Sequence, residues 1–364
     1  MKLGVNLGYW GAGNDADNLA LAREADRLGY AVCWAAEAYG SDAATVLSWV
    51  AAQTEQIDVG SAIFQIPGRT PALTAMTAAT LDSLSGGRFR LGLGVSGPQV
   101  SEGWHGIPFK APLGRTREYV DIVKLALSRQ RVAYDGKHYQ LPLPGGPGKA
   151  LKLTVHPVRT EIPIYLAAVG PKNLELTGEI ADGWLAIFYS PQFAGEQLAQ
   201  IGAGRAKAGK DMTGFDVVPT VPIVVDSDLE RAAEQIRWYA ALYIGGMGSK
   251  EQNFYNQLAC RMGFEAEADR IQELYMAKEH RNAAAAVPFE FVDATSLIGP
   301  PERIAERMRL FAESGVTTLT LAPYASTLAD RLSALETGKT ALAAAGLADP
   351  PEAAADAAAH DAAA

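Results

Sequence analysis

The chain has 364 residues, with 32 Lys and Arg against 41 Asp and Glu, so its net charge is −9. This acidic balance argues against a protein that coats nucleic acid and against a basic helix on a membrane surface, because both need an excess of cations. A hydrophobic fraction of 48 % with 20 % charged residues is typical of a globular chain and excludes global disorder.

The cysteines and the hydropathy of the chain narrow its class further. Cys33 and Cys260 are too few and too far apart for a disulfide framework or a zinc cluster. The start has no signal-peptide core, and no apolar run approaches the length of about 18 residues that a membrane span needs. We therefore expect a cytoplasmic protein with no bound metal, no nucleic-acid partner and no membrane partner.

One local pattern recurs along the chain: a helix ends at Gly and a short apolar run follows. It occurs at Gly29, Gly87, Gly183 and Gly315. Gly suits the left-handed residue that closes a helix, and short apolar runs are typical of strands covered on both faces. With four similar runs elsewhere, the pattern predicts eight strands that begin near residues 3, 31, 57, 88, 162, 184, 217 and 316.

Predicted helices fill the intervals, over residues 17–28, 41–54, 71–84, 115–127, 172–180, 191–207, 229–243, 300–314 and 327–345. Strands that alternate with helices form either a closed (β/α)8 barrel or an open doubly wound sheet. The count of eight, and the helix after the last strand, favour the barrel. We expect one α/β domain, a (β/α)8 TIM barrel over residues 1–345, followed by a disordered low-complexity tail at 346–364.

Three stretches interrupt the repeat, at about residues 95–112, 131–160 and 244–299. The second is rich in Pro and Gly and predicts a hairpin arm near 139–143, and the third predicts a helix near 265–281. Insertions of this kind usually lie over the active end of a barrel.

The chemistry of a barrel gathers where its strands end. The expected strand ends are rich in aromatic and small residues and poor in Lys, Asp and His, which suits a flat ring held by packing and backbone hydrogen bonds. Five aromatic residues are expected to form an entrance for a mainly apolar substrate: Tyr9, Trp10, Phe64, Trp104 and Phe188.

Gly92, Gly94 and Gly97 match the G-x-G-x-x-G pattern of dinucleotide sites. That motif also needs a helix at the third Gly and an acidic residue after the next strand, whereas residues 98–105 are predicted to be a loop. We favour the alternative in which Gly92 and Gly94 permit tight packing inside a narrow barrel. A nicotinamide dehydrogenase with an open sheet is the rival interpretation.

A second candidate site is the turn at which a strand gives way to a helix. Its residues are Ala167, Ala168, Val169, Gly170 and Pro171. Free N–H groups at a helix start can bind a phosphate. The alternative is an ordinary strand-to-helix turn.

Three side chains are candidates for proton transfer. Glu37 ends an apolar strand, where a carboxylate is either functional or paired with a neighbouring Arg. Glu102 and His105 share one loop, and His105 could act as an acid or as a donor to a carbonyl oxygen.

Several short segments together resemble the luciferase-like flavin and deazaflavin oxidoreductases, and within them the coenzyme F420-dependent oxidoreductases of actinobacteria. They are residues 34–40, 60–63, 69–72, 81–89, 91–94 and 181–184. The resemblance implies a barrel that is often dimeric, and hydride transfer between C5 of a deazaflavin ring and a small organic substrate: an alcohol or carbonyl, or an activated alkene.

The resemblance also implies positions for the cofactor. Its phosphate falls on the 167–171 turn, and its ring falls beside Val95, Ser96 and Gly97 and against a cis peptide bond between Ala62 and Ile63. Glu37 stands where several relatives have an Asp-His pair, so the proton donor is open among Glu37, Glu102 and His105, and Glu37 is also expected to contact the cofactor. Four basic residues are expected to meet the acidic tail of F420: Arg69, Lys110, Arg115 and Arg117.

Two further alternatives share the same fold. One is a monooxygenase that uses reduced FMN in place of F420. The other is a protein that binds a deazaflavin without catalysis.

Overall fold

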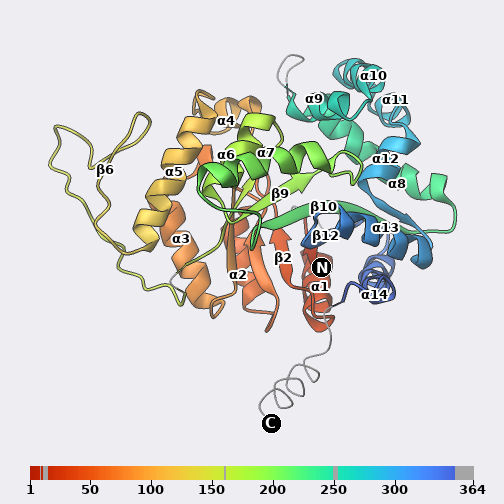
Figure 1. Ribbon diagram of the computed structural model, residues 1–364, viewed down its shortest axis with the longest axis horizontal. Coiled ribbons are helices and arrows are strands. Elements are labelled where there is room, and N and C mark those ends of the chain that lie inside the picture. The colour runs from red at the N-terminus through yellow and green to blue at the C-terminus, as the bar shows by residue number, and fades with distance from the viewer. Residues whose placement is uncertain (9, 11–14, 160, 249–252, 349–364) are drawn as a thin grey trace, which may run out of the picture.

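Eight parallel strands close into a barrel in the computed structural model, which describes residues 1–8, 10, 15–159, 161–248 and 253–348 (Figure 1). They are β1 (Lys2–Asn6), β2 (Val32–Ala35), β3 (Asp58–Ser61), β5 (Phe89–Gly94), β8 (Ile164–Ala167), β9 (Gly183–Ile187), β10 (Asp216–Val225) and β12 (Thr318–Pro323). Each strand pairs with the next, and β12 also pairs with β1. The predicted barrel is confirmed, and the open sheet of a nicotinamide dehydrogenase is wrong because closure leaves no edge.

Each of the nine predicted helices occurs, with ends shifted by a few residues. They are α1 (Asp15–Arg27), α2 (Ala43–Ala51), α3 (Pro71–Leu84), α5 (Pro112–Leu127), α6 (Pro171–Ile180), α7 (Ala194–Lys207), α8 (Leu229–Ala241), α13 (Pro301–Glu313) and α14 (Leu328–Ala344). Local signals place their starts. Thr70 caps α3 through its hydroxyl, with Pro71 in the first turn, and Asp42 caps α2.

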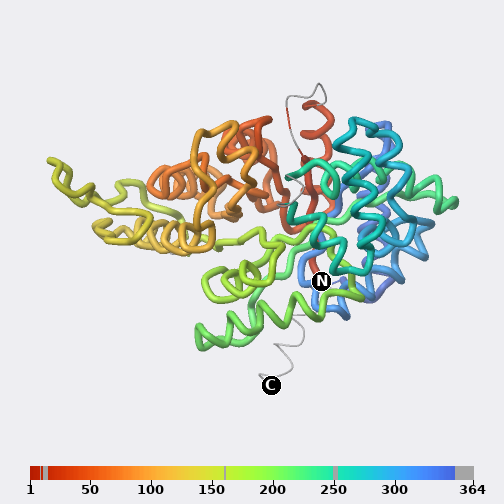
Figure 2. Tube along the Cα trace, turned by 90° about the horizontal axis from the view of Figure 1, so that it is seen from above, coloured from red at the N-terminus to blue at the C-terminus, as the bar shows by residue number. Residues whose placement is uncertain are grey.

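The first two interruptions have structure of their own. The predicted loop after Gly97 is wrong in part, because a short helix α4 (Pro98–Gly103) begins there with Pro98 in its first turn. The expected arm contains a hairpin of β6 (Tyr134–Asp135) and β7 (Gln140–Leu141), and it extends well beyond α5 in Figures 1 and 2.

The third interruption forms a small helical layer at the end of the molecule where α4 also lies (Figure 1). It contains the π-helix η2 (Leu242–Gly246), α9 (Phe254–Arg261), α10 (Glu265–Met276), α11 (His280–Ala285), α12 (Phe289–Thr295) and β11 (Leu297–Gly299). It has its own apolar core, and β11 pairs only with the far end of β10. Of the expected tail, residues 349–364 lie outside the described residues.

The barrel interior is filled in layers. At the end where strands begin, Arg90 donates to Asp58 (2.8 Å) and Asp216 (3.3 Å). Asp216 also accepts from the hydroxyls of Tyr165 (3.0 Å) and Thr318 (2.9 Å), so five strands meet in one polar plug. An apolar cluster that contains Trp34 and Tyr165 forms a separate buried group of the barrel.

A single carboxylate closes the turn between α2 and β3. Asp26 accepts the backbone N–H groups of Glu55 (2.8 Å), Gln56 (2.9 Å) and Ile57 (2.7 Å). Partial burial acts to raise the pKa of Asp26, but the three donors and the charge of Arg88 outweigh it and hold the pKa below its ordinary value. The ionised form therefore stabilises the fold.

We predict that Asp26→Asn lowers the free energy of unfolding by about 1–2 kcal/mol at pH 7, measured by urea denaturation. A depressed native pKa contributes stability above the unfolded pKa of about 3.9, and this contribution is lost as pH falls through the native value. The difference in the free energy of unfolding between the variant and wild type should thus become smaller below about pH 4. Asp269→Asn, at an exposed site on α10, is the control. A difference that does not change with pH would contradict this assignment.

Candidate active site

The third barrel strand is interrupted at its carboxyl end. It continues as β4 (Phe64–Gln65) and the turn η1 (Ile66–Gly68), and the peptide bond between Ala62 and Ile63 is cis, as expected. Gly60 pairs with Arg90, whereas Phe64 pairs with Leu93. Phe64 is four residues after Gly60, whereas Leu93 is only three after Arg90. The third strand therefore contains one extra residue, which forms a β-bulge.

The bulge is held to β5 by the side chain of Ser61. Its hydroxyl donates to the Gly92 carbonyl (2.8 Å) and accepts the Gly92 N–H (2.9 Å), and all three groups are buried. A Cβ on Gly92 would lie 1.9 Å from the Ser61 carbonyl oxygen. The interpretation that Gly92 permits tight packing is therefore confirmed.

The bulge and β8 together form an apolar floor at the mouth of the barrel. Ala62, Ile63 and Ala167 are half-buried and pack on the cluster that contains Trp34 and Tyr165. A Cβ on Gly94 would lie 2.9 Å from Ile63 Cδ1 and 3.6 Å from Ala167 Cβ, so both side chains lie beside Gly94. We call Ala62, Ile63, Gly94 and Ala167 the floor.

Of the residues expected at the phosphate, Ala167 ends β8 and belongs to the floor, and residues 168–171 form the turn that follows it. Gly170 precedes α6, Pro171 is in its first turn, and the Ala168 carbonyl accepts the Trp184 indole N–H at 2.9 Å. A helix start has backbone N–H groups without helical partners. The structure thus places the expected phosphate turn beside the expected ring surface.

The expected ring loop follows β5, the strand that pairs with β8 in the barrel. Ser96 has a left-handed backbone (φ 60°), and its hydroxyl donates to Gln65 Oε1 at 2.9 Å. Gln65 Nε2 donates to the Ala38 carbonyl at 2.6 Å, and Gln65 is 2 % exposed. Gln65 therefore orients the loop formed by Val95, Ser96 and Gly97. Sequence reasoning missed the role of Gln65, because the sequence shows only a Gln at a strand end and not that its amide is buried.

Both carboxylate oxygens of Glu37 accept hydrogen bonds from within the protein. Its side chain is 11 % exposed and accepts from Arg69 Nη2 (2.9 Å) and Nε (3.3 Å) and from the N–H of Ala43 (3.2 Å). Of the two alternatives for this carboxylate, the contacts are those of the ion pair with a neighbouring Arg. Glu37 thereby joins the end of β2 to the start of α2 and to the segment after β4.

Two of the four basic residues expected to meet an acidic tail are already paired. Arg69 binds Glu37 and Asp42 and lies 4.5 Å from the centre of the Phe64 ring. Burial acts to lower the pKa of Arg69, but the two carboxylates outweigh it and raise the pKa. Arg117 pairs with Glu179. Nearby carboxylates already neutralise these two cations, whereas Lys110 and Arg115 line a small recess beside Val95. Contact of the four with an acidic tail stays a prediction.

The two candidates in the α4 region differ in their surroundings. Glu102 is exposed and accepts the Phe109 N–H at 2.9 Å. His105 packs over Gly68, where a Cβ would lie 2.9 Å from His105 Cε1. Its Nε2 atom is buried and has no hydrogen-bond partner among the described residues. A buried imidazole nitrogen without a partner is an unsatisfied polar group, and a bound ligand is one group that could satisfy it.

The expected aromatic entrance is largely wrong. Phe64 and Phe188 are buried in apolar clusters, and Trp10 is buried against Trp49. Trp104 alone among the described members is open to solvent, at 67 %. Tyr9 lies outside the described residues.

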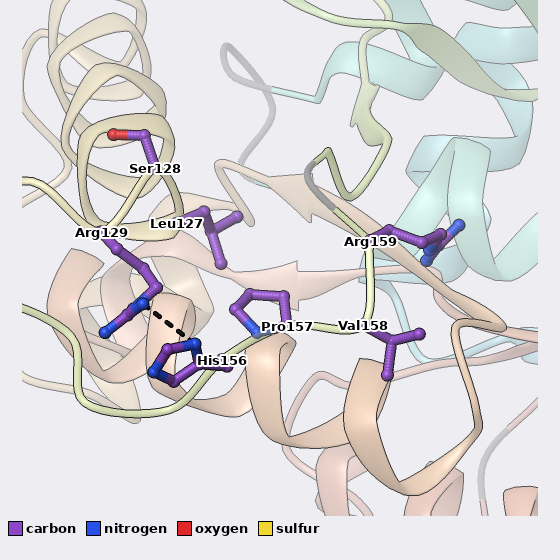
Figure 3. A pocket seen from close by; sticks show the side chains of 7 residues that line it. All are labelled: Leu127, Ser128, Arg129, His156, Pro157, Val158 and Arg159. Atoms are coloured by element: carbon purple, nitrogen blue, oxygen red, sulfur yellow. Dashed lines mark hydrogen bonds between the residues drawn. The ribbon is translucent and has the colours of Figure 1, made fainter.

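A pocket of about 370 Å³ lies elsewhere, where α5 ends (Figure 3). It is lined by Leu127, Ser128, Arg129, His156, Pro157, Val158 and Arg159. Arg159 there binds Asp82 at the end of α3 and the Phe89 carbonyl at the start of β5. The pocket therefore belongs to the end where strands begin, opposite the floor.

The described residues contain no group of three or more His, Cys, Asp or Glu side chains suited to a metal ion. Over the same part of the chain, no helix combines the length and the apolar character needed to cross a membrane.

The chain belongs to the luciferase-like monooxygenase family, which matches residues 7–318. A Mycobacterium tuberculosis protein named "Putative coenzyme F420-dependent oxidoreductase" is 43 % identical over 88 % of this chain and 94 % of its own length. The 5,10-methylenetetrahydromethanopterin reductase of Archaeoglobus fulgidus is 30 % identical over 80 % of this chain and 85 % of its own.

Solved structures share the fold. The coenzyme F420-dependent tetrahydromethanopterin reductase of Methanopyrus kandleri has a TM-score of 0.79 at 24 % identity, covering 93 % of this chain and 97 % of that one. An F420-dependent secondary alcohol dehydrogenase, in complex with an F420-acetone adduct, has a TM-score of 0.77 at 17 % identity, covering 96 % and 99 %.

We predict that Ser61→Ala lowers the free energy of unfolding by about 1–3 kcal/mol, because it leaves the buried Gly92 N–H and carbonyl without their partner. Ser128→Ala, which removes an exposed hydroxyl bonded to the Leu125 carbonyl, is the control and should change stability little. Urea denaturation of both variants measures the effect. Equal stability of Ser61→Ala and wild type would show that the hydroxyl does not support the bulge.

Proposed function

We propose that this chain is a coenzyme F420-dependent oxidoreductase that transfers a hydride between C5 of the deazaflavin and a small organic substrate, either an alcohol or carbonyl or an activated alkene. The observation that carries the proposal is the apolar floor directly beside a helix-start turn. This pair suits a molecule with a flat ring at one end and a phosphate further along. The F420-dependent relatives support the same cofactor.

The residues present fit this cofactor. A Cβ on Gly94 would fill space against Ile63 and Ala167, so glycine there keeps the floor open for a ring. Bound F420 supplies the hydride chemistry, and the chain's own part is to hold and orient it. The floor covers one ring face and excludes water from it. The ring loop formed by Val95, Ser96 and Gly97 borders the ring, and the 168–171 turn receives the phosphate.

Titration with F420 and with FMN, followed by fluorescence, tests the proposal. We expect F420 to bind at least about tenfold more tightly at moderate salt, because Lys110 and Arg115 are near the ring loop and offer positive charge to its acidic tail. FMN binding of equal or greater strength would favour the monooxygenase that uses reduced FMN. Saturable F420 binding with no turnover of any alcohol, carbonyl or activated alkene would favour a non-catalytic binding protein.

We propose that His105 moves the proton that accompanies hydride transfer. Its buried Nε2 has no partner among the described residues, whereas the Glu37 carboxylate is taken up by Arg69 and Glu102 is exposed. A positioned His contributes typically about 10²–10⁴-fold to a rate. Glu37 then serves to position Arg69 and the strand ends around it.

We predict that His105→Asn lowers turnover by about 10²-fold or more and changes F420 affinity less than about threefold. Turnover is followed by the absorbance of the oxidised deazaflavin. His156→Asn, at an exposed site at the other end of the barrel, is the control. If His105→Asn is active and Glu37→Gln or Glu102→Gln is not, a carboxylate moves the proton and the assignment is wrong.

We propose that the enzyme is a homodimer joined through α2 and α3. Helix α3 exposes Leu73, Met76 and Leu84, at spacings of three and eight residues, and the neighbouring α2 exposes Trp49. Monomeric proteins rarely leave large apolar patches uncovered, and a two-fold contact would cover the stripes of both copies. The arm beyond α5 exposes Leu143 as well.

We predict that Met76→Asp shifts the protein toward monomer, measured by light scattering after size-exclusion chromatography, because the charge would be buried in the contact. Leu310→Asp makes the same change at an exposed site on α13 and should leave the mass unchanged. A wild type that is monomeric at micromolar concentration would contradict the proposed dimer.

We place the enzyme in the cytoplasm on the basis of its thiols. Cys33 and Cys260 are both free, and burial raises the pKa of the Cys33 thiol. Two unpaired, poorly reactive thiols are typical of proteins in a reducing compartment.

A further inference from the structure

Two carbonyl groups in the 168–171 turn are bonded from within the protein. The Trp184 indole N–H donates to the Ala168 carbonyl at 2.9 Å, and Arg261 Nη2 donates to the Val169 carbonyl at 3.1 Å. Trp184 comes from β9, the next barrel strand, whereas Arg261 comes from the last turn of α9 in the helical insertion. Residues 92 positions apart in the chain thus meet at this turn.

These bonds fix the direction of two N–H groups. The carbonyl and the N–H of one trans peptide point in opposite directions. Because Arg261 holds the Val169 carbonyl, it sets the plane of the Val169–Gly170 peptide and turns the Gly170 N–H away from α9. In the same way, the Trp184 indole holds the Ala168 carbonyl, sets the plane of the Ala168–Val169 peptide and fixes the direction of the Val169 N–H. Neither N–H donates to a backbone group among the described residues.

The arginine is held on a rigid support. The side chains of Asn253 and Asn256, both buried, donate to the Ile244 carbonyl, and Asn256 also donates to the Ala268 carbonyl. These bonds join α9 to η2 and α10. Val169 itself packs against the apolar core of the insertion. The helical insertion therefore holds Arg261 in a fixed position, and Arg261 in turn holds the Val169 carbonyl of the turn.

Arg261 is also a source of positive charge. It forms no ion pair with a carboxylate within the part of the chain that the structure describes, and a guanidinium has five donors of which the Val169 carbonyl uses one. A cation that is not neutralised favours an anion nearby.

We propose that Arg261 is a positioning residue for the cofactor phosphate. It holds the Val169–Gly170 peptide so that the Gly170 N–H faces the phosphate, and it lends positive charge to the site. This inference rests on the proposed F420-dependent function. It assigns the helical insertion a role in cofactor binding that is separate from any contact with substrate.

The test compares two ligands: F420, and the same deazaflavin without its phosphate and acidic tail. Arg261→Met keeps an unbranched apolar stem and removes the donors and the charge. We expect it to weaken F420 binding by about tenfold or more, and to change binding of the tail-free deazaflavin less than about twofold. Arg261→Lys, which keeps the charge and one donor, should recover part of the loss.

Arg281→Met removes an exposed cation from α11 and serves as the control for overall charge. Equal losses for both ligands in Arg261→Met would show a merely structural role, and no loss would show no role; either result overturns the inference. If wild type binds neither ligand, the proposed function itself is wrong. If wild type binds F420 and Arg261→Met matches it, only the role of Arg261 is wrong.

Discussion

The close contact between the bulge after β3 and the glycines of β5 is the constraint on which the candidate site depends. The Ser61 hydroxyl satisfies both backbone groups of Gly92, and Gly92 has no room for a side chain. Two residues further along β5, a Cβ on Gly94 would meet Ile63 and Ala167, so the absence of a side chain there leaves space beside both. A buried hydrogen-bond pair and two missing Cβ atoms thus produce an apolar surface at the mouth of the barrel, with a helix start beside it.

The two ends of the barrel differ in their role: side chains where the strands begin hold the barrel closed, and the candidate site lies where the strands end. Residues 81–89, one of the segments that carry the family resemblance, lie at the end where strands begin. There the Asp82 carboxylate is fully buried against Arg159, and Arg88 donates to four backbone carbonyls, those of Ala51, Thr54, Ile57 and Ser85. With the polar plug around Arg90, this end holds the barrel closed, while the floor, the ring loop and the 168–171 turn occupy the other end. A motif that identifies the family therefore need not touch a ligand.

The strands, the helices and the turn before α6 could be predicted because their signals are local: glycine after a helix, an apolar run, a proline in a first turn. The partners of polar side chains could not. Glu37 and Arg69 are 32 positions apart, and no local pattern says that they pair. The same is true of the hydrogen bond from Ser96 to Gln65 and of the hydrogen bond from Arg261 to the Val169 carbonyl. The aromatic entrance failed for a related reason, since a strand-end aromatic such as Phe188 can turn into the core as readily as toward the mouth.

In the proposed complex, the floor would carry the ring of F420 and the 168–171 turn would carry its phosphate. A crystal structure of the protein with F420 bound tests it most directly. We expect one ring face against Ala62, Ile63 and Ala167, the other face open, and a phosphate oxygen within about 3 Å of the Gly170 nitrogen. A ring bound elsewhere, or a phosphate remote from the start of α6, would contradict it.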